Sequence, residues 1–108
     1  MVNKRTRKSA LKIVKHYLAD LKNAGVHIKI AILFGSYAQG KQHKWSDIDL
    51  ALVADNFTGL SFVDKEPFRF VQLKKEYTPI EAHTFATDYF EKGDAFIDEI
   101  KQSGIRIL

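Results

Sequence analysis

The sequence predicts an α/β fold in which helices cover a small mixed β-sheet. Residues 28–34 form a short apolar run rich in β-branched residues, which is typical of a buried strand, and residues 47–53 and 79–85 are predicted to be two further strands. Helical segments alternate with these strands, which gives the order α-β-α-β-α-β-α-β with a last short strand at 105–108. We expect a single domain over residues 1–108, because a chain of this length has little room for a second core.

The first two helices have clear local signals. Apolar residues recur at helical spacing over residues 10–24, with lysines on the opposite side. Ser9 is a suitable N-cap, and Gly25 is a suitable residue just beyond the end of the helix. A short helix is expected over residues 36–39, closed by Gly40.

Two further helices are expected in the second half of the chain. Residues 65–76 are predicted to be helical with Pro67 in the first turn, although their apolar residues do not form one stripe. Residues 88–102 are predicted to form one helix that ends at Gly104. Gly93 lies on the apolar face of that helix, where it allows close packing or a small kink.

Composition excludes several classes of protein. Hydrophobic residues make up 45% of the chain and charged residues 28%, which argues against intrinsic disorder. No apolar run approaches the roughly 20 residues that cross a bilayer, so no membrane partner is expected. The absence of cysteine and of a secretory signal makes a reducing compartment, the cytoplasm, the expected location.

The positive charge is concentrated at the N-terminus. The formal net charge is +4, but residues 1–15 alone carry +6 and the rest of the chain carries −2. Residues 1–9 are therefore expected to be a basic arm, either a solvated approach to the first helix or a contact for an acidic partner or polyanion. Sequence-specific DNA binding is not expected, because no helix-turn-helix pattern appears.

The stretch from Phe34 to Val53 (FGSYAQGKQHKWSDIDLALV) contains the most informative motif. A buried strand ends at Gly35-Ser36 and passes into the start of a helix. Such a turn presents free backbone N–H groups, which suit a phosphate, and Gly35 lets a ligand approach the backbone closely. The hydroxyl of Ser36 adds a further donor.

Two carboxylates follow on the next strand. Alternation places Asp47 and Asp49 on one face, while Ile48 and Leu50 point into the core. Adjacent carboxylates repel each other unless cations neutralise them, and hard oxygen ligands without cysteine favour Mg²⁺ or Mn²⁺. A pair of such ions about 3.5–4 Å apart can hold a triphosphate and the attacking oxygen.

A third acidic residue is expected on a neighbouring strand. Glu81 is the best candidate, because it lies between apolar residues on a predicted strand and is costly to bury unless it binds something. It is suited to completing a metal site and accepting a proton from a hydroxyl. His83 shares the strand face of Glu81, but a surface or core histidine is the simpler interpretation. In the loop after Gly40, Lys41 and Lys44 are either phosphate contacts or ordinary solvated lysines.

Gly35-Ser36, ten intervening residues and Asp47-Ile48-Asp49 resemble the signature of the DNA-polymerase-β-type nucleotidyltransferase superfamily. The surrounding GSYAQG and SDIDLALV resemble its minimal nucleotidyltransferase (MNT) branch. The resemblance implies a nucleotidyltransferase-like core in which the Gly-Ser turn holds nucleotide phosphates. It also implies that Asp47 and Asp49 bind two divalent cations, Mg²⁺ with Mn²⁺ as the alternative, and that Glu81 binds one cation and acts as base. Many members carry Arg or Lys, a phosphate contact, at the position of Gln39 in this chain. Lys41 or Lys44 is the candidate to make that contact here.

The same resemblance implies an enzyme that transfers AMP from ATP, or another NMP from its NTP, to a hydroxyl of a partner protein. Minimal members are often paired with a small helical HEPN toxin, for which they act as antitoxins. Two alternatives remain open from the sequence. One is a toxin-binding module without catalysis, and the other is a subunit that modifies a small molecule such as an antibiotic in a cleft between two copies of the chain.

Overall fold

The computed structural model describes residues 5–108, and the expected basic arm therefore lies partly outside the described residues, at positions 1–4. Four strands form one sheet in the order β3-β2-β1-β4. These are β1 (Ile30–Phe34), β2 (Ile48–Ala54), β3 (Ile80–Ala86) and β4 (Ile105–Arg106). β1 is antiparallel to both β2 and β4, whereas β2 and β3 are parallel. The predicted mixed sheet flanked by helices is confirmed.

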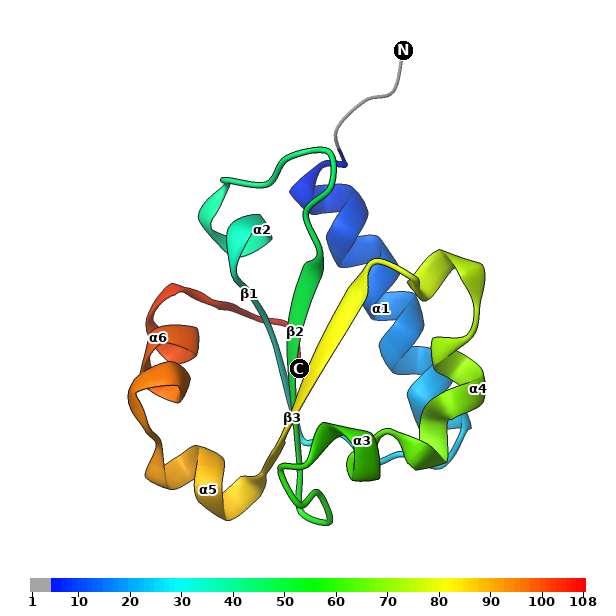
Figure 1. Ribbon diagram of the computed structural model, residues 1–108, viewed down its shortest axis with the longest axis vertical. Coiled ribbons are helices and arrows are strands. Elements are labelled where there is room, and N and C mark those ends of the chain that lie inside the picture. The colour runs from blue at the N-terminus through cyan, green and yellow to red at the C-terminus, as the bar shows by residue number, and fades with distance from the viewer. Residues whose placement is uncertain (1–4) are drawn as a thin grey trace.

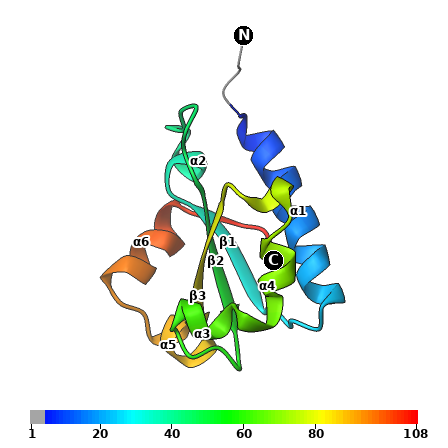
Figure 2. The same ribbon diagram turned by 45° about the vertical axis from the view of Figure 1, so that its right-hand side comes forward.

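Helices cover both faces of this sheet, as Figure 1 shows. One face packs against α1 (Arg7–Asn23) and the short helices of residues 61–77, and the other packs against α5 (Thr87–Lys92) and α6 (Ala95–Ser103). Figure 2 shows the two helical layers on either side of the strands. Alternation along β2 explains the two cores, because Leu50 lies in the core beneath α1 and Ala51 lies in the core beneath α5 and α6.

The first helix begins earlier than the sequence pattern predicts. α1 starts at Arg7, and its N-cap is Thr6, whose hydroxyl oxygen accepts a hydrogen bond from the backbone N–H of Ser9 at 3.0 Å. The expectation that Ser9 is the N-cap is therefore wrong, and the end of the expected arm is helical. At the other end, Gly25 has φ +86° and follows the C-cap Ala24, as predicted.

The segment predicted as one helix over residues 65–76 is broken into short pieces. They are α3 (Ser61–Asp64), the 3₁₀ turn η1 (Glu66–Phe68), α4 (Arg69–Gln72) and the 3₁₀ turn η2 (Lys75–Tyr77). The prediction of a continuous helix is wrong because these apolar residues do not share a single helical face, and Pro67 lacks the N–H that a continuing helix needs.

A buried carboxylate fixes the start of this segment. Asp64 accepts hydrogen bonds from the backbone N–H groups of Thr58 (2.8 Å) and Gly59 (2.9 Å). It also accepts from the hydroxyls of Thr58 (3.0 Å) and of Thr84 on β3 (2.7 Å). Asp64 therefore connects the loop after β2 to the sheet.

The predicted helix over residues 88–102 is two helices. The chain turns at Gly93, which has φ +82° and ψ +165°, and α6 restarts with Asp94 as its N-cap. The Asp94 carboxylate accepts a hydrogen bond from the N–H of Ile97 at 2.8 Å. The glycine on the apolar face is thus a break between helices and not a kink within one.

The last strand is shorter than the predicted 105–108, since β4 comprises only Ile105 and Arg106. The backbone contact nevertheless continues, because Ile107 N–H donates to the carbonyl of Ala31 at 2.8 Å. Between residues 5 and 108, none of the helices combines the length and apolar character that a bilayer crossing requires.

Candidate functional site

The predicted site residues lie at the end of the sheet where β1 ends and where β2 and β3 begin. Phe34 on β1 pairs with Asp49 on β2, and Asp49 pairs with Glu81 on β3. Residues in register on adjacent strands project from the same face of a sheet, and adjacent strands are about 4.8 Å apart. Asp49 and Glu81 are therefore side by side, at the end of the sheet near α2 (Ser36–Gln39) and the loop of residues 40–47 (Figure 1).

Asp49 is the central acidic residue of the site. Its neighbours in the chain, Ile48 and Leu50, are fully buried on the α1 side of the sheet. The carboxylate therefore projects to the α5/α6 side, and its side chain is 29% exposed. Glu81 lies on the same face and is exposed, so the expectation that this carboxylate is buried between its apolar neighbours is wrong. Asp47 is exposed too, but it precedes the first residue of β2, so the expectation that it belongs to the strand is wrong.

Gly35 joins β1 to α2 and lies directly against the Asp49 carboxylate. It has φ +74° and ψ −149°, a conformation that is essentially restricted to glycine. A Cβ atom built on Gly35 would also collide with the Asp49 carboxylate oxygen. The glycine is thus required twice, once by the turn and once by the close approach of the acid. Ser36 is the first residue of α2.

A residue of the expected basic arm holds α2 in place. Arg7, at the start of α1, donates from Nε to the carbonyl of Tyr37 and from Nη2 to the carbonyl of Ala38, both at 2.9 Å. Tyr37 itself is fully buried. Sequence reasoning missed this role, because nothing local distinguishes Arg7 from its basic neighbours.

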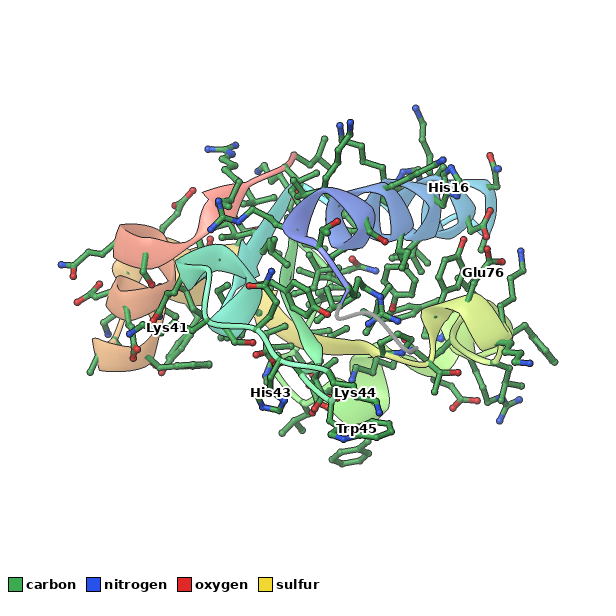
Figure 3. The ribbon with its side chains drawn as sticks, turned by 90° about the horizontal axis from the view of Figure 1, so that it is seen from above. His16, Lys41, His43, Lys44, Trp45 and Glu76 are labelled. Carbon is green, nitrogen blue, oxygen red and sulfur yellow. The ribbon has the colours of Figure 1, made fainter. Side chains whose placement is uncertain are left out.

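The loop between α2 and β2 has its own internal hydrogen bonds. Ser46 Oγ accepts from the N–H of His43 at 2.8 Å, and the carbonyl of His43 accepts from the N–H of Ser46 at 3.0 Å. The Lys44 ammonium lies 4.9 Å from the centre of the exposed Trp45 ring. Figure 3 looks onto this loop and shows Lys41 well apart from the side chains of Lys44 and Trp45. Both lysines are on the loop beside the sheet end, but Lys44 stacks on Trp45.

Reasoning from the sequence underestimated His83, whose imidazole lies close to Asp49. Its Nε2 atom is 3.7 Å from Asp49 Oδ1. Its ring packs edge-on against Phe34, with ring centres 5.1 Å apart, and against Phe96 on α6, at 6.1 Å. The available signal was its position two residues after Glu81, which places both side chains on one strand face.

The side chains at this end of the sheet fit a hard divalent cation that is completed by a ligand. Among residues 5–108, no three histidine, aspartate or glutamate side chains are grouped closely enough to hold a metal ion by themselves. Mg²⁺ is commonly bound through one or two carboxylates together with substrate phosphates, and adjacent Asp49 and Glu81 supply such a pair. Beside that pair, the Nε2 atom of His83 is buried without a hydrogen-bond partner. This nitrogen is a further atom that is available to bind a metal ion.

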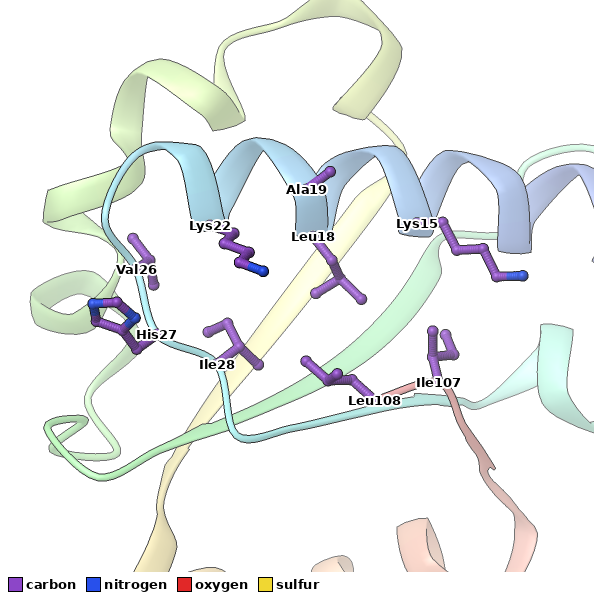
Figure 4. Close-up of a pocket in the computed structure, with 9 residues that line it drawn as sticks. All are labelled: Lys15, Leu18, Ala19, Lys22, Val26, His27, Ile28, Ile107 and Leu108. Carbon is purple, nitrogen blue, oxygen red and sulfur yellow. The ribbon is translucent and has the colours of Figure 1, made fainter.

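A hollow of about 400 Å³ lies elsewhere, between α1, residues 26–28 and the last two residues of the chain. Leu18, Ile28 and Ile107 form part of its wall, and Lys15 and Lys22 also border it (Figure 4). None of the predicted site residues lines it. The candidate site is therefore not this hollow but the end of the sheet at Asp49 and Glu81.

Comparisons with known proteins agree with this fold. The family model described as "Polymerase beta, Nucleotidyltransferase" matches residues 14–108. A solved structure from Sulfolobus solfataricus, of a protein provisionally named a nucleotidyltransferase, superposes with a TM-score of 0.62 at 16% identity. That match covers 98% of this chain and 89% of the other, and at this identity it shows a shared fold. A search of curated proteins finds no match.

The family match includes the Gly35 turn, both strands that bear the acids and all of the helices after α1. It agrees with the polymerase-β-type signature in the sequence and with the sheet on which Asp49 and Glu81 are neighbours. The chain therefore belongs to the polymerase beta nucleotidyltransferase family.

Proposed function

We propose that this protein is a metal-dependent nucleotidyltransferase that moves AMP from ATP to a hydroxyl group of a partner protein. The observation that carries the proposal is the in-register pair Asp49 and Glu81 beside the Gly35 turn. The family supports general nucleotidyl transfer. AMP as the transferred group, Mg²⁺ or Mn²⁺ as the metal and a protein as acceptor are parts of the proposal.

In this reaction the acceptor hydroxyl oxygen attacks the α-phosphorus of ATP. A new P–O bond forms, the bond between the α-phosphorus and the bridging oxygen breaks, and pyrophosphate leaves. Divalent cations, when bound, neutralise phosphate charge and polarise the α-phosphoryl group. Asp49 and Asp47 hold them, and Glu81 holds one and accepts the proton of the attacking hydroxyl.

The turn at Gly35 and the following loop orient the triphosphate. The absence of a side chain at Gly35 leaves the backbone open beside Asp49, and the hydroxyl of Ser36 donates to a phosphate oxygen. Lys41 and Lys44 supply positive charge from the loop before β2. Arg7 keeps α2 in position through its two backbone carbonyl contacts, so it is a positioning residue. The contribution of the chain is thus mainly orientation and charge neutralisation.

A protein acceptor is supported by the apolar surface of the segment 61–77. Phe62 is 79% exposed, Phe70 77% and Leu73 73%, although all three are large apolar side chains. Large apolar side chains that are exposed within one segment are available to contact another protein. We propose that the acceptor docks there, and the resemblance of GSYAQG and SDIDLALV to the MNT branch identifies a small helical HEPN toxin as the candidate. The protein would then be the antitoxin of the pair.

The test measures transfer of label. The purified protein is mixed with Mg²⁺ or Mn²⁺, α-³²P-labelled ATP, GTP, CTP or UTP, and the protein encoded by the neighbouring gene. We expect label from ATP to enter the acceptor with release of pyrophosphate. Asp49→Asn removes the charge of a metal-binding carboxylate and should abolish labelling without unfolding the protein. Asp88→Asn makes the same chemical change at an exposed position on α5 and should not alter labelling.

Two results would contradict the proposal. Undiminished labelling in Asp49→Asn would show that the acidic pair does not carry the chemistry. No labelling from any of the four nucleotides, with an acceptor that binds the folded protein, would show that this member does not transfer nucleotides to it.

A further inference from the structure

One buried nitrogen atom at the site has no partner. His83 Nε2 is shielded from solvent and makes no hydrogen bond, although the histidine side chain as a whole is 33% exposed. A buried polar atom without a partner destabilises a fold by about 1–3 kcal/mol, and native proteins rarely leave one unsatisfied without a functional reason. The position of this nitrogen therefore requires an explanation.

The imidazole ring is held in place by its neighbours. His83 on β3 pairs with Ala51 on β2, and two residues closer to the site, on the same face of the sheet, Asp49 pairs with Glu81. The ring leans toward Asp49 and packs edge-on against Phe34. Phe96 contacts it from α6. Packing against these two phenylalanine rings therefore holds the imidazole with its nitrogen close to the Asp49 carboxylate.

The distance between His83 Nε2 and Asp49 Oδ1 distinguishes a direct hydrogen bond from the binding of one cation by both atoms. Nε2 and Asp49 Oδ1 are 3.7 Å apart, beyond the separation of about 2.7–3.2 Å that a hydrogen bond needs. Two donors that bind one cation at about 2.1 Å each are instead roughly 3–4 Å apart, depending on the angle between them. The observed separation thus matches two donors of one ion.

We propose that His83 Nε2 is a ligand, together with Asp49, of the divalent cation used at this site. The inference rests on the proposed function for the presence of a cation at Asp49. Carboxylates alone suit Mg²⁺, whereas an imidazole nitrogen favours transition-metal ions. A mixed oxygen and nitrogen donor set therefore makes the site select Mn²⁺ over Mg²⁺.

The experiment measures cation binding without nucleotide or acceptor, so that it does not depend on transfer activity. Mn²⁺ is titrated into the full chain and free Mn²⁺ is followed by electron paramagnetic resonance; Mg²⁺ is added as a competitor. His83→Phe keeps an aromatic ring against Phe34 and Phe96 and removes the nitrogen. His16→Phe makes the same change at an exposed position on α1. Circular dichroism checks that each variant is folded.

We expect wild-type protein to bind Mn²⁺ in a manner that Asp49→Asn abolishes. His83→Phe should weaken Mn²⁺ binding about tenfold or more, the smallest effect expected of a lost ligand, while Mg²⁺ affinity changes much less. Pulsed resonance of the Mn²⁺ complex should show coupling to a ¹⁴N nucleus that disappears in His83→Phe and persists in His16→Phe. A residue that only supported the fold would not produce that nitrogen signal.

The inference is overturned if His83→Phe binds Mn²⁺ as the wild type does, if no ¹⁴N coupling is seen, or if the wild type binds no Mn²⁺. These failures are distinguishable from failure of the proposed function. Nitrogen-coupled Mn²⁺ binding without any nucleotide transfer would support His83 as a ligand and contradict the proposed activity. Nucleotide transfer together with unaltered Mn²⁺ binding in His83→Phe would support the activity and contradict His83 as a ligand.

Discussion

Replacing Gly35 by alanine tests the geometry of the site most directly. The substitution has two separable effects. It places a side chain on a backbone with φ +74° and ψ −149°, and it directs that side chain at the Asp49 carboxylate. The first effect concerns the fold, whereas the second concerns the acid on which the proposed chemistry depends.

The backbone effect alone is worth about 2 kcal/mol, since a non-glycine residue in such a region is strained by about 1–3 kcal/mol. Displacing the carboxylate adds about 1 kcal/mol, the lower end of the cost of overpacking. We therefore expect Gly35→Ala to lower the free energy of unfolding by about 3 kcal/mol. For a chain of this size that corresponds to a fall in Tm of roughly 12–15 °C.

Gly93→Ala is the matched control. Gly93 has φ +82° and ψ +165°, a similar conformation, but its added Cβ meets only the end of the Asp98 side chain at 3.1 Å. Because Asp98 is exposed and can move, this variant reports the backbone effect without the displaced acid. We expect it to lose about 2 kcal/mol.

Urea denaturation of Gly35→Ala, Asp49→Ala and the double variant isolates the second effect. Removing the Asp49 carboxylate removes the collision, so the double variant should be about 1 kcal/mol more stable than the sum of the single changes predicts. Mn²⁺ titration should show weakened binding in Gly35→Ala and unaltered binding in Gly93→Ala. A coupling energy near zero, or equal losses of stability in the two glycine variants, would refute the close approach of Gly35 to Asp49.

Two further predictions concern the fold at its acid and alkaline limits. Burial raises the pKa of the Asp64 carboxyl, but hydrogen bonds from Thr58, Gly59 and Thr84 outweigh it and hold that pKa below its usual range. The resulting stability is present above about pH 4 and is lost as pH falls through the folded-state pKa. Asp64→Asn should lower the free energy of unfolding by about 2 kcal/mol at pH 7 and reduce its dependence on pH in the acid range, as measured by urea denaturation. An unchanged acid dependence in this variant would contradict the role of the Asp64 carboxylate. Burial raises the pKa of both Tyr17 and Tyr77, so stability should fall as pH rises above about 10, where the unfolded chain releases the phenol protons. Absorbance at 295 nm should show these two tyrosines ionising only on unfolding, and ionisation in the folded protein near pH 10 would refute their burial.

The strands and the face on which the acids lie could be predicted from the sequence. Each predicted strand begins and ends within two residues of the observed one. For the first strand the reason is its apolar, β-branched composition, which is typical of a buried strand. Alternation within β2 correctly placed Ile48 and Leu50 in the core. That placement already directs Asp49 to the opposite face, where the structure has it.

The helical segments between strands were less predictable, because their course depends on contacts far away in the chain. Phe68 is buried and Phe70 is exposed within one short segment, a pattern set by the sheet surface beneath them and not by a helical period. The first helix is extended by Arg7, whose partners are carbonyls of α2. No local pattern identifies such partners.

The position of His83 depends on the register between β2 and β3. The sequence shows that Glu81 and His83 share a face, but only the pairing of Asp49 with Glu81 brings the imidazole to the carboxylate. A parallel pair has no hairpin turn to set its register, since a long connection joins the two strands. The contact between His83 and Asp49 could therefore not be predicted from local sequence patterns.

The parallel pairing of β2 with β3 also determines where the chain tolerates insertions and deletions. A single inserted residue within β2 or β3 reverses the faces of all side chains beyond it, and would turn Asp49 or Glu81 toward α1. The connection from Asp64 to Ile80 is free of that alternation because it contains only short helices and turns, whereas the loop before it is fixed by the hydrogen bonds of Asp64 to Thr58 and Gly59. Among related sequences, length variation should therefore accumulate in that connection, while both strands keep their length to the residue.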